Sequence, residues 1–264
     1  MRITIITFNI YGVPFSKLPA RLDRICRVMS ELEPDIINLQ QVHTYRALHQ
    51  LTRRLPSSYY VTYKPSLLGP KAGLVILSQS KPLQSEFCQV NRASRLLGVN
   101  VKGVLLVEMA GLSLCNVHLS ANTEGNWSEE SVRFYGMHKS QLTKLNNFIT
   151  TFAKQPVIIT GDFNVPADSE LFESFIAASH LQDAFAKDFK PTFHKEFLPP
   201  GEPGRRIDHV LFIDPNKQAK AVKKMRLFDE LVPIGGTKLA YLSDHSGLYA
   251  SIEIALPSMK ALAP

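Results

Sequence analysis

The feature of this sequence that most restricts its fold is the alternation of short apolar runs with stretches of helical periodicity. Residues 3–10 (ITIITFNI) have the length and composition of a strand, and apolar side chains then recur at helical spacing over residues 18–32, before Pro34. The same alternation continues along the chain. It predicts further strands at 35–42, 59–64, 73–78, 156–160, 206–214 and 246–256, and further helices around 45–51, 142–152 and 171–176.

Some of the predicted strands must pair antiparallel. Residues 101–119 predict two consecutive strands joined by a tight turn at Ala110–Gly111, with no helix between them. Such neighbours lack the crossover that parallel pairing requires, so the sheets must be mixed. We therefore expect an α/β fold in which helices cover mixed sheets. Residues 1–264 are assigned to a single domain, because no repeat, low-complexity tract or long linker divides the chain.

Composition and the lengths of the apolar runs exclude several classes of protein. A hydrophobic fraction of 45% excludes an intrinsically disordered chain. No apolar run approaches the ~20 residues of a membrane-spanning helix, and Met1–Arg2 lead into the first strand without the apolar stretch of a signal peptide. Three scattered cysteines (Cys26, Cys88 and Cys115) are typical of reduced thiols. These observations predict a cytoplasmic protein, which we expect to be a monomer. Its net charge of 30 − 23 = +7 suits nucleic acid or an anionic membrane surface as a partner.

Side chains of the types that bind metals and phosphate stand where several predicted strands end. Each has an ordinary structural interpretation: Asn9 as a turn residue, His118 as a core histidine, and Asp162 with Asn164 as a turn before Pro166. Burying so many polar groups costs free energy, which is hard to explain by folding alone. Ligands of α/β sheets bind beyond strand ends, so we predict one pocket. The remaining candidates are Gln40, Gln41, Asp208, Ser243, Asp244 and His245.

The motifs around these residues resemble those of the endonuclease/exonuclease/phosphatase superfamily, the DNase I-like metal-dependent phosphoesterases. The resemblance runs from residue 3 to about residue 254, through TFNI, NLQQV, NVHLS, GDFN, RIDHV and SDH in that order. It implies a four-layer α/β/β/α sandwich of two mixed sheets, which agrees with the alternation of strands and helices.

The resemblance also implies a role for each site residue. Asn9 and Gln41 would bind Mg²⁺, with Mn²⁺ as an alternative, and Asp244 would lie near the metal. Asp162 and Asn164 would position the attacking water and the phosphoryl oxygens. His118 would donate a hydrogen bond to a non-bridging oxygen. His245 would be the general acid or base, oriented by Asp208, and whether Asp162 or His245 takes the proton of the water stays open.

One position departs from the family motif. The motif carries a glutamate as metal ligand where NLQQV has Gln41. A glutamine oxygen can still coordinate, but the site loses a full negative charge, which weakens Mg²⁺ binding. Either Gln41 is natural, in a degenerate or retuned enzyme, or the residue was changed to trap an inactive complex. Because every other site position is intact, we favour the second explanation.

Three functions compete for this site. A sphingomyelinase-like lipid phosphodiesterase is favoured by AGLVILS at 72–78, by Lys102–Gly103, by HLSAN at 118–122 and by a following helix with Arg133 and Gln141. A DNA endonuclease or exonuclease is the alternative, since the positive charge would attract a phosphate backbone. A phosphate-binding module without turnover is the third, if Gln41 is natural. The substrate would therefore be a phosphodiester in a lipid headgroup or a nucleic acid.

A lipid enzyme needs an apolar contact with the membrane near its site. Trp127 is the only tryptophan and follows His118 closely, and Phe193, Phe197 and Leu198 lie in another long loop. Either segment could insert at a peripheral membrane contact, although Trp127 could equally cap the next helix. We assign Lys102, Arg133 and Trp127 as candidate substrate contacts.

Overall fold

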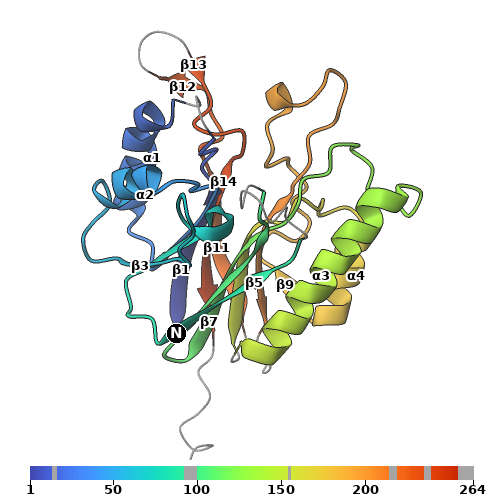
Figure 1. Ribbon diagram of the computed structural model, residues 1–264, viewed down its shortest axis with the longest axis horizontal. Helices are drawn as coiled ribbons and strands as arrows, with labels where there is room; N and C mark the ends of the chain where they lie inside the picture. Colours follow the sequence, from blue (N-terminus) through green and yellow to red (C-terminus); the bar gives the residue numbers. More distant parts are fainter. Residues whose placement is uncertain (14–16, 92–99, 154–155, 214–218, 235–238, 255–264) are drawn as a thin grey trace, which may run out of the picture.

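The computed structural model describes residues 1–13, 17–91, 100–153, 156–213, 219–234 and 239–254, and their core is a pair of facing six-stranded sheets with helices outside (Figure 1). The first sheet has the order β11-β14-β1-β2-β4-β3 and the second β5-β6-β7-β8-β10-β9. Two pairs, β1 with β2 and β7 with β8, are parallel, and the others within these two sheets are antiparallel. The mixed α/β/β/α sandwich expected from the sequence is confirmed.

The strands have the following bounds. The first sheet contains β1 (Arg2–Asn9), β2 (Ile36–Gln40), β3 (Tyr60–Thr62), β4 (Val75–Ser78), β11 (Lys220–Leu227) and β14 (Gly247–Glu253). The second contains β5 (Gln84–Gln89), β6 (Gly103–Met109), β7 (Leu112–His118), β8 (Val157–Asp162), β9 (Gln182–Asp183) and β10 (Asp208–Ile213). A separate hairpin pairs β12 (Val232–Pro233) with β13 (Leu239–Ala240).

In the part of the chain that the structure describes, four helices complete the layers. They are α1 (Leu18–Leu32), α2 (Tyr45–Thr52), α3 (Val132–Phe152) and α4 (Glu170–Ser179), and two short 3₁₀ turns are η1 (Lys71–Gly73) and η2 (Lys195–Phe197). The apolar faces of α1 and α2 pack on the first sheet, and those of α3 and α4 pack on the second. A third apolar cluster fills the space between the two sheets. No helix among the described residues has both the length and the apolar character to cross a bilayer.

Three edge strands were missed by the sequence analysis: the two-residue β9 and the longer strands β5 and β11. β5 (QSEFCQ) and β11 (KAVKKMRL) each pair with one neighbour only, and most of their side chains are exposed or half-buried. Their polar composition suits an edge open to water but hides the strand pattern. The strand expected at 246–256 ends at Glu253, and the part of this segment from residue 255 lies outside the described residues.

A polar layer joins the two sheets beneath their strand ends. Asn38 Nδ2 donates to Thr160 Oγ1 at 2.9 Å, and Gln40 Nε2 donates to Asn116 Oδ1 at 2.7 Å. Asn116 in turn donates to the carbonyl oxygens of Leu39 and Val75. Asn38 Oδ1 and Gln40 Oε1 have no hydrogen-bond partner among the described residues, but the bonds made by the amide nitrogens of this layer connect one sheet to the other just below the residues that carry the predicted site.

Candidate active site

Asn9 and Asp162 bring the ends of the two sheets together. Asn9 Nδ2, at the end of β1, donates to Asp162 Oδ2, at the end of β8, across 3.1 Å. His245 Nε2 lies 3.4 Å from Asn9 Nδ2 and 3.8 Å from Asp162 Oδ2. All three side chains are buried. Three motifs from distant parts of the sequence therefore meet at one point.

Asp208 holds the other side of the His245 ring. The register of β10 against β8 places Asp208 opposite Asp162, and Asp208 Oδ2 lies 2.8 Å from His245 Nδ1. A carboxylate at Nδ1 fixes that nitrogen as the donor and leaves Nε2 facing the cluster. Burial by itself lowers the pKa of His245, but the carboxylates of Asp208 and Asp162 outweigh it and raise the pKa to about 10. His245 is thus a buried imidazolium held by the carboxylates of Asp208 and Asp162.

Asp162 and Asn164 form a tight turn after β8. The backbone N–H of Asn164, whose φ is 53°, donates to Asp162 Oδ1 at 3.0 Å, and Asn164 Nδ2 donates to the carbonyl of Leu119. The Asx-type turn anticipated from the sequence is therefore present, and it also aims Asp162 Oδ2 at Asn9. Burial raises the pKa of Asp162 to about 6, against the opposing effect of His245.

His118 brings the side chain of Lys102 to the cluster. Pairing of β6 with β7 sets Gly103 opposite His118, and Lys102 Nζ contacts His118 Nε2. His118 Nε2 also lies 3.5 Å from Asp162 Oδ2. Burial, followed by the charge of Lys102, holds the pKa of His118 well below its usual value, so its imidazole is neutral. Burial lowers the pKa of Lys102 to about 8.

Gln41 offers an oxygen suited to a metal. Its Oε1 is buried without a hydrogen-bond partner, and its backbone has a φ of 61°. A side chain at Gly12 would meet the Gln41 carbonyl oxygen at 2.0 Å, and Gly73, at a φ of 67°, lies against the Gln41 Cα atom. Both close approaches require glycine. These contacts fix the backbone of Gln41, and its unpartnered side-chain oxygen is of the kind that coordination of a hard cation would satisfy.

Asp244 is linked to Asn9 through Ser243. Ser243 Oγ donates to the backbone carbonyl of Asn9 at 2.6 Å and contacts Asp244 Oδ1 at 3.1 Å. Asn9, Gln41 and Asp244, the three residues predicted from the sequence to lie at the metal, each carry a side-chain oxygen of the kind that Mg²⁺ binds. Asp162, Asp208 and His245 also form a group that could hold a metal ion, with ligand atoms within 4.8 Å of one another.

The predicted substrate contacts occupy different surroundings. Lys102 joins the cluster through His118, as described above. Trp127 is half-buried and its indole donates to the Asn164 carbonyl at 2.9 Å, which does not favour insertion of this side chain into a membrane. Arg133 is exposed in the first turn of α3, with its guanidinium packed over Phe134.

A buried arginine supports the site and was not predicted from the sequence. Arg21, on the apolar face of α1, donates to the carbonyl oxygens of Ile10, Tyr11 and Leu242. It thereby ties the segment after Asn9 to the segment before Asp244. The available signal was an arginine set between Leu18 and Leu22 on an apolar helical stripe.

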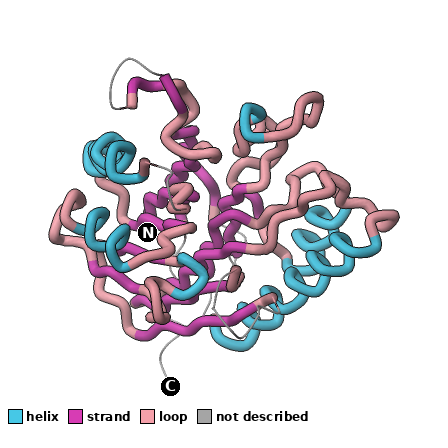
Figure 2. Tube along the Cα trace, turned by 45° about the horizontal axis from the view of Figure 1, so that its top comes forward, coloured by secondary structure: helices cyan, strands magenta, loops and turns pink. Residues whose placement is uncertain are grey.

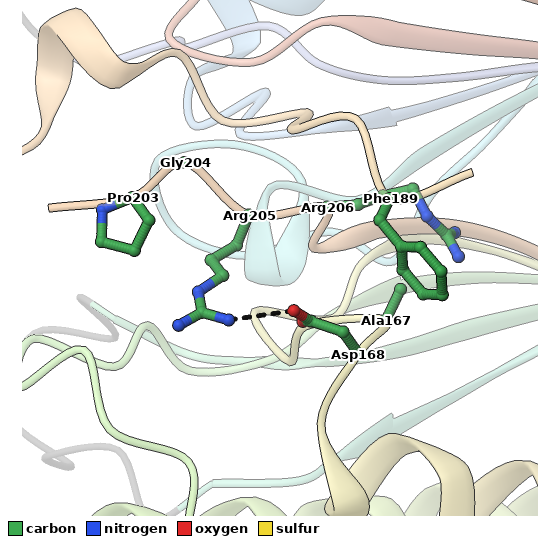
Figure 3. A pocket seen from close by; sticks show the side chains of 7 residues that line it. All are labelled: Ala167, Asp168, Phe189, Pro203, Gly204, Arg205 and Arg206. Atoms are coloured by element: carbon green, nitrogen blue, oxygen red, sulfur yellow. Dashed lines mark hydrogen bonds and ion pairs between the residues drawn. The ribbon is translucent and has the colours of Figure 1, made fainter. Parts of the chain in front are cut away.

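A cavity of about 180 Å³ lies beside the turn that follows Asn164. Figure 3 shows Arg205 reaching across it to an ion pair with Asp168. The Arg205 guanidinium also lies 5.9 Å from the centre of the Trp127 ring. None of the residues of the cluster lines this cavity. Its lining consists of Ala167, Asp168, Phe189, Pro203, Gly204, Arg205 and Arg206.

Comparison with known proteins identifies the family. The profile of the Endonuclease/Exonuclease/phosphatase family matches residues 6–245, a span that contains the whole cluster. Human nocturnin is 25% identical over 254 residues, covering 86% of this chain and 57% of nocturnin, so the chain spans little more than half of that relative.

Solved structures share the fold. TDP2 from D. rerio, complexed with a single-strand DNA product, has a TM-score of 0.71 at 18% identity and covers 96% of this chain and 99% of its own. Beta toxin from Staphylococcus aureus has a TM-score of 0.71 at 15% identity, covering 94% and 99%. A protein of Bacteroides vulgatus described as an endonuclease/exonuclease/phosphatase has a TM-score of 0.72 at 21% identity, covering 97% and 100%. Taken with the match over residues 6–245, the chain belongs to the endonuclease/exonuclease/phosphatase family.

Proposed function

We propose that this chain hydrolyses a phosphodiester with the help of a bound divalent cation, and that the substrate is a lipid of the sphingomyelin type. The observation that carries the hydrolytic part is the contact of Asn9, Asp162 and His245 at the junction of the two sheets, with Asp208 behind His245. Phosphoryl transfer requires groups that move protons and groups that stabilise developing charge. Asp162 and the oriented imidazole of His245 are suited to the first task, and the amide of Asn9 is suited to the second.

Asn9, Gln41 and Asp244 would hold the cation. Bound there, Mg²⁺ or Mn²⁺ would supply positive charge to stabilise the charge that develops on the phosphoryl oxygens. The unpartnered Oε1 of Gln41 supports this assignment, because a buried carbonyl oxygen otherwise carries a desolvation cost.

The residues of the chain would divide the remaining work. A bond forms between the water oxygen and phosphorus, and the bond from phosphorus to the leaving oxygen breaks. Asp162 and His245 would take the proton from the water and return one to the leaving oxygen, with Asp208 keeping the His245 ring in position. His118, backed by the Lys102 cation, and Asn164 would face the phosphoryl oxygens.

A lipid substrate is supported by the sequence around Lys102–Gly103 and by the contact of Lys102 with His118. This contact gives the site a cation for the phosphate of a headgroup. A nuclease is the second candidate, because D. rerio TDP2, which shares the fold, was solved with a single-strand DNA product. Trp127 beside Asn164 would suit either a headgroup or a base.

Glutamine at position 41 should lower the rate of the reaction without changing its type. A neutral amide in place of a carboxylate weakens Mg²⁺ binding, and a chain with glutamine here could bind phosphate esters with little turnover. The assay below therefore uses both the parent and the Gln41→Glu variant.

The test is a parallel assay on sphingomyelin, a phosphoinositide, DNA with an abasic site and a small soluble phosphodiester, each in Mg²⁺ and in EDTA. We expect Mg²⁺-dependent release of phosphocholine from sphingomyelin, faster with Gln41→Glu. Preferential cleavage of DNA would instead establish the nuclease. Binding of the substrates without hydrolysis by either protein would leave a phosphate-binding module and refute the proposed activity.

A further inference from the structure

The loop between β9 and β10 places aromatic rings beside the cluster. It carries Phe193 and Phe197, and Figures 1 and 2 show this loop, with the short turn η2, projecting from the body of the molecule. Phe193 forms a β-bridge with His245. Its ring stands edge-on to the His245 imidazole, with the ring centres 5.0 Å apart. A phenyl ring therefore borders the proposed acid–base residue directly.

Phe197 continues this surface outward. Its ring centre lies 6.4 Å from that of Phe193 and 6.0 Å from that of Tyr11. Phe197 is 44% exposed, and Phe193 is half-buried. Tyr11 donates its backbone N–H to Asn9 Oδ1, and the guanidinium of Arg21 already packs over the Tyr11 ring. Tyr11 thus positions Phe197, and the two phenyl rings, here called the aromatic wall, are left to contact a ligand.

The aromatic wall is fixed to the site by backbone hydrogen bonds. His194 N–H donates to the Asp244 carbonyl at 2.9 Å, and Ser246 N–H donates to the Thr192 carbonyl at 2.7 Å. The residues on both sides of Phe193 are therefore bonded to the residues on both sides of the proposed acid–base histidine. The wall and the reacting groups are held in one arrangement.

The angles between the rings favour a rounded ligand over a flat one. The interplanar angle is 85° between Phe193 and His245, and 66° between Phe193 and Phe197. A nucleobase binds by lying parallel to aromatic faces. Steeply inclined rings instead surround a compact group, as the aromatic cages that bind quaternary ammonium ions do.

The charges beside the wall favour a cation. His194 lies in the loop between the two phenylalanines, and burial lowers its pKa. The carboxylates of Asp229, Glu196 and Asp244 act in the opposite direction, and the His245 cation opposes them. One of these carboxylates, that of Asp229, is paired with a lysine. The others leave negative charge near the rings.

The strand ends of the second sheet place a cation away from the wall. In the sheet order β6-β7-β8-β10, the residues at this edge are Lys102 (just before β6), His118, Asp162 and Asp208. The Lys102 cation therefore lies toward one end of the row. The aromatic wall lies toward the other end, beyond the imidazole that Asp208 holds. A phosphate near His118 would leave its attached group free to extend along the row to the wall.

We propose that Phe193 and Phe197 bind the trimethylammonium group of a phosphocholine ester whose phosphate lies at His118 and Lys102. This inference rests on the proposed lipid substrate and names the part of the headgroup that the site selects. The faces of aromatic rings attract quaternary ammonium cations, and such a cation has no N–H group that needs a hydrogen-bond acceptor.

The test is calorimetric titration of phosphocholine and of neohexyl phosphate, in which a neutral carbon replaces the nitrogen. We expect Phe197→Leu and Phe193→Leu each to weaken phosphocholine binding roughly fivefold, and to change neohexyl phosphate binding much less. Phe197→Trp should tighten phosphocholine binding, because indole is the strongest partner for a cation. The matched control is Phe189→Leu. Phe189 is 56% exposed in the same loop but lines the separate cavity, so this change should alter neither affinity.

Hydrolysis of a small soluble phosphodiester without choline separates this inference from the proposed function. Equal weakening of both ligands in Phe197→Leu, or no binding of phosphocholine by the parent, would overturn the inference while hydrolysis upholds the activity. Tighter binding of thymidine monophosphate than of phosphocholine, lost in Phe197→Leu, would assign the wall to a nucleobase instead. A loss confined to phosphocholine, without hydrolysis of any substrate, would uphold the inference and refute the activity. Comparing sphingomyelin with glycerophosphocholine in the hydrolysis assay distinguishes a lipid from a small choline ester.

Discussion

Asp208 Oδ2 lies 2.8 Å from Nδ1 of His245, and both side chains are buried. The contact joins the first residue of β10 to the residue two positions before β14, so it bridges the two sheets. It fixes which ring nitrogen of His245 faces Asp162. The orientation of the imidazole is therefore a property of how the sheets pack.

This relationship predicts strong coupling between the two residues. His245→Ala should reduce turnover by ~100-fold or more, the usual contribution of a general acid or base. The double variant with Asp208→Ala should lose little beyond that, because the two act as a unit. Steady-state turnover of the four proteins gives the coupling energy. Independent, additive losses would assign Asp208 another role.

The residues that face the phosphoryl group should be essential for turnover but not for folding. We expect His118→Ala, Asp162→Ala and Asn164→Ala each to reduce turnover by at least ~100-fold while unfolding stays cooperative. His209→Ala is the matched control. His209 is as buried as His118 but bonds Arg206 and the Val165 carbonyl and stacks on Phe172. It should lose stability and retain turnover when folded; the reverse pattern would contradict the assignment.

Lys102 should act through its charge on the substrate. Lys102→Met removes a cation beside His118, and we expect turnover to fall by about tenfold or more, as for loss of one charge-stabilising contact. Lys102→Arg should recover part of the loss. Measuring kcat and KM separately distinguishes substrate binding from stabilisation of the transition state. Unchanged kinetics in Lys102→Met would remove Lys102 from the site.

Arg21 should matter for stability and for the metal site together. Arg21→Met leaves the carbonyls of Ile10, Tyr11 and Leu242 without their guanidinium donor. Each unsatisfied buried acceptor costs about 1–3 kcal/mol, so we expect a loss of several kcal/mol in the free energy of unfolding, measured by urea denaturation. Mg²⁺ affinity should fall as well. Normal stability would show that these carbonyls find other donors.

The sequence was most informative where pattern and chemistry coincide. Helix α1 was predicted over its observed span because its apolar spacing is regular and Pro34 follows it. The convergence of Asn9, Asp162 and His245 was predicted because strand ends in such sheets meet at one edge. The residue numbers alone could not show which atoms face one another.

The missed features depend on tertiary structure. The Asn38, Gln40 and Asn116 layer sits on strands that otherwise read as apolar core, and its members only become partners once the sheets face each other. Arg21 looked like one arginine among many on a basic chain. The exposure of Leu67 and Leu68 could not be predicted, because leucines in a short loop are as consistent with a covered turn.

The central claim concerns Gln41, whose side-chain oxygen has no hydrogen-bond partner and is proposed to bind a divalent cation. The most direct test is calorimetric titration of Mg²⁺ into the parent and into Gln41→Glu, with turnover measured on the same samples. A carboxylate there should tighten Mg²⁺ binding and raise turnover by about tenfold or more, each ~1.4 kcal/mol being worth a factor of ten. Equal Mg²⁺ affinities and equal rates would show that position 41 does not hold the metal, and would contradict this account of the site.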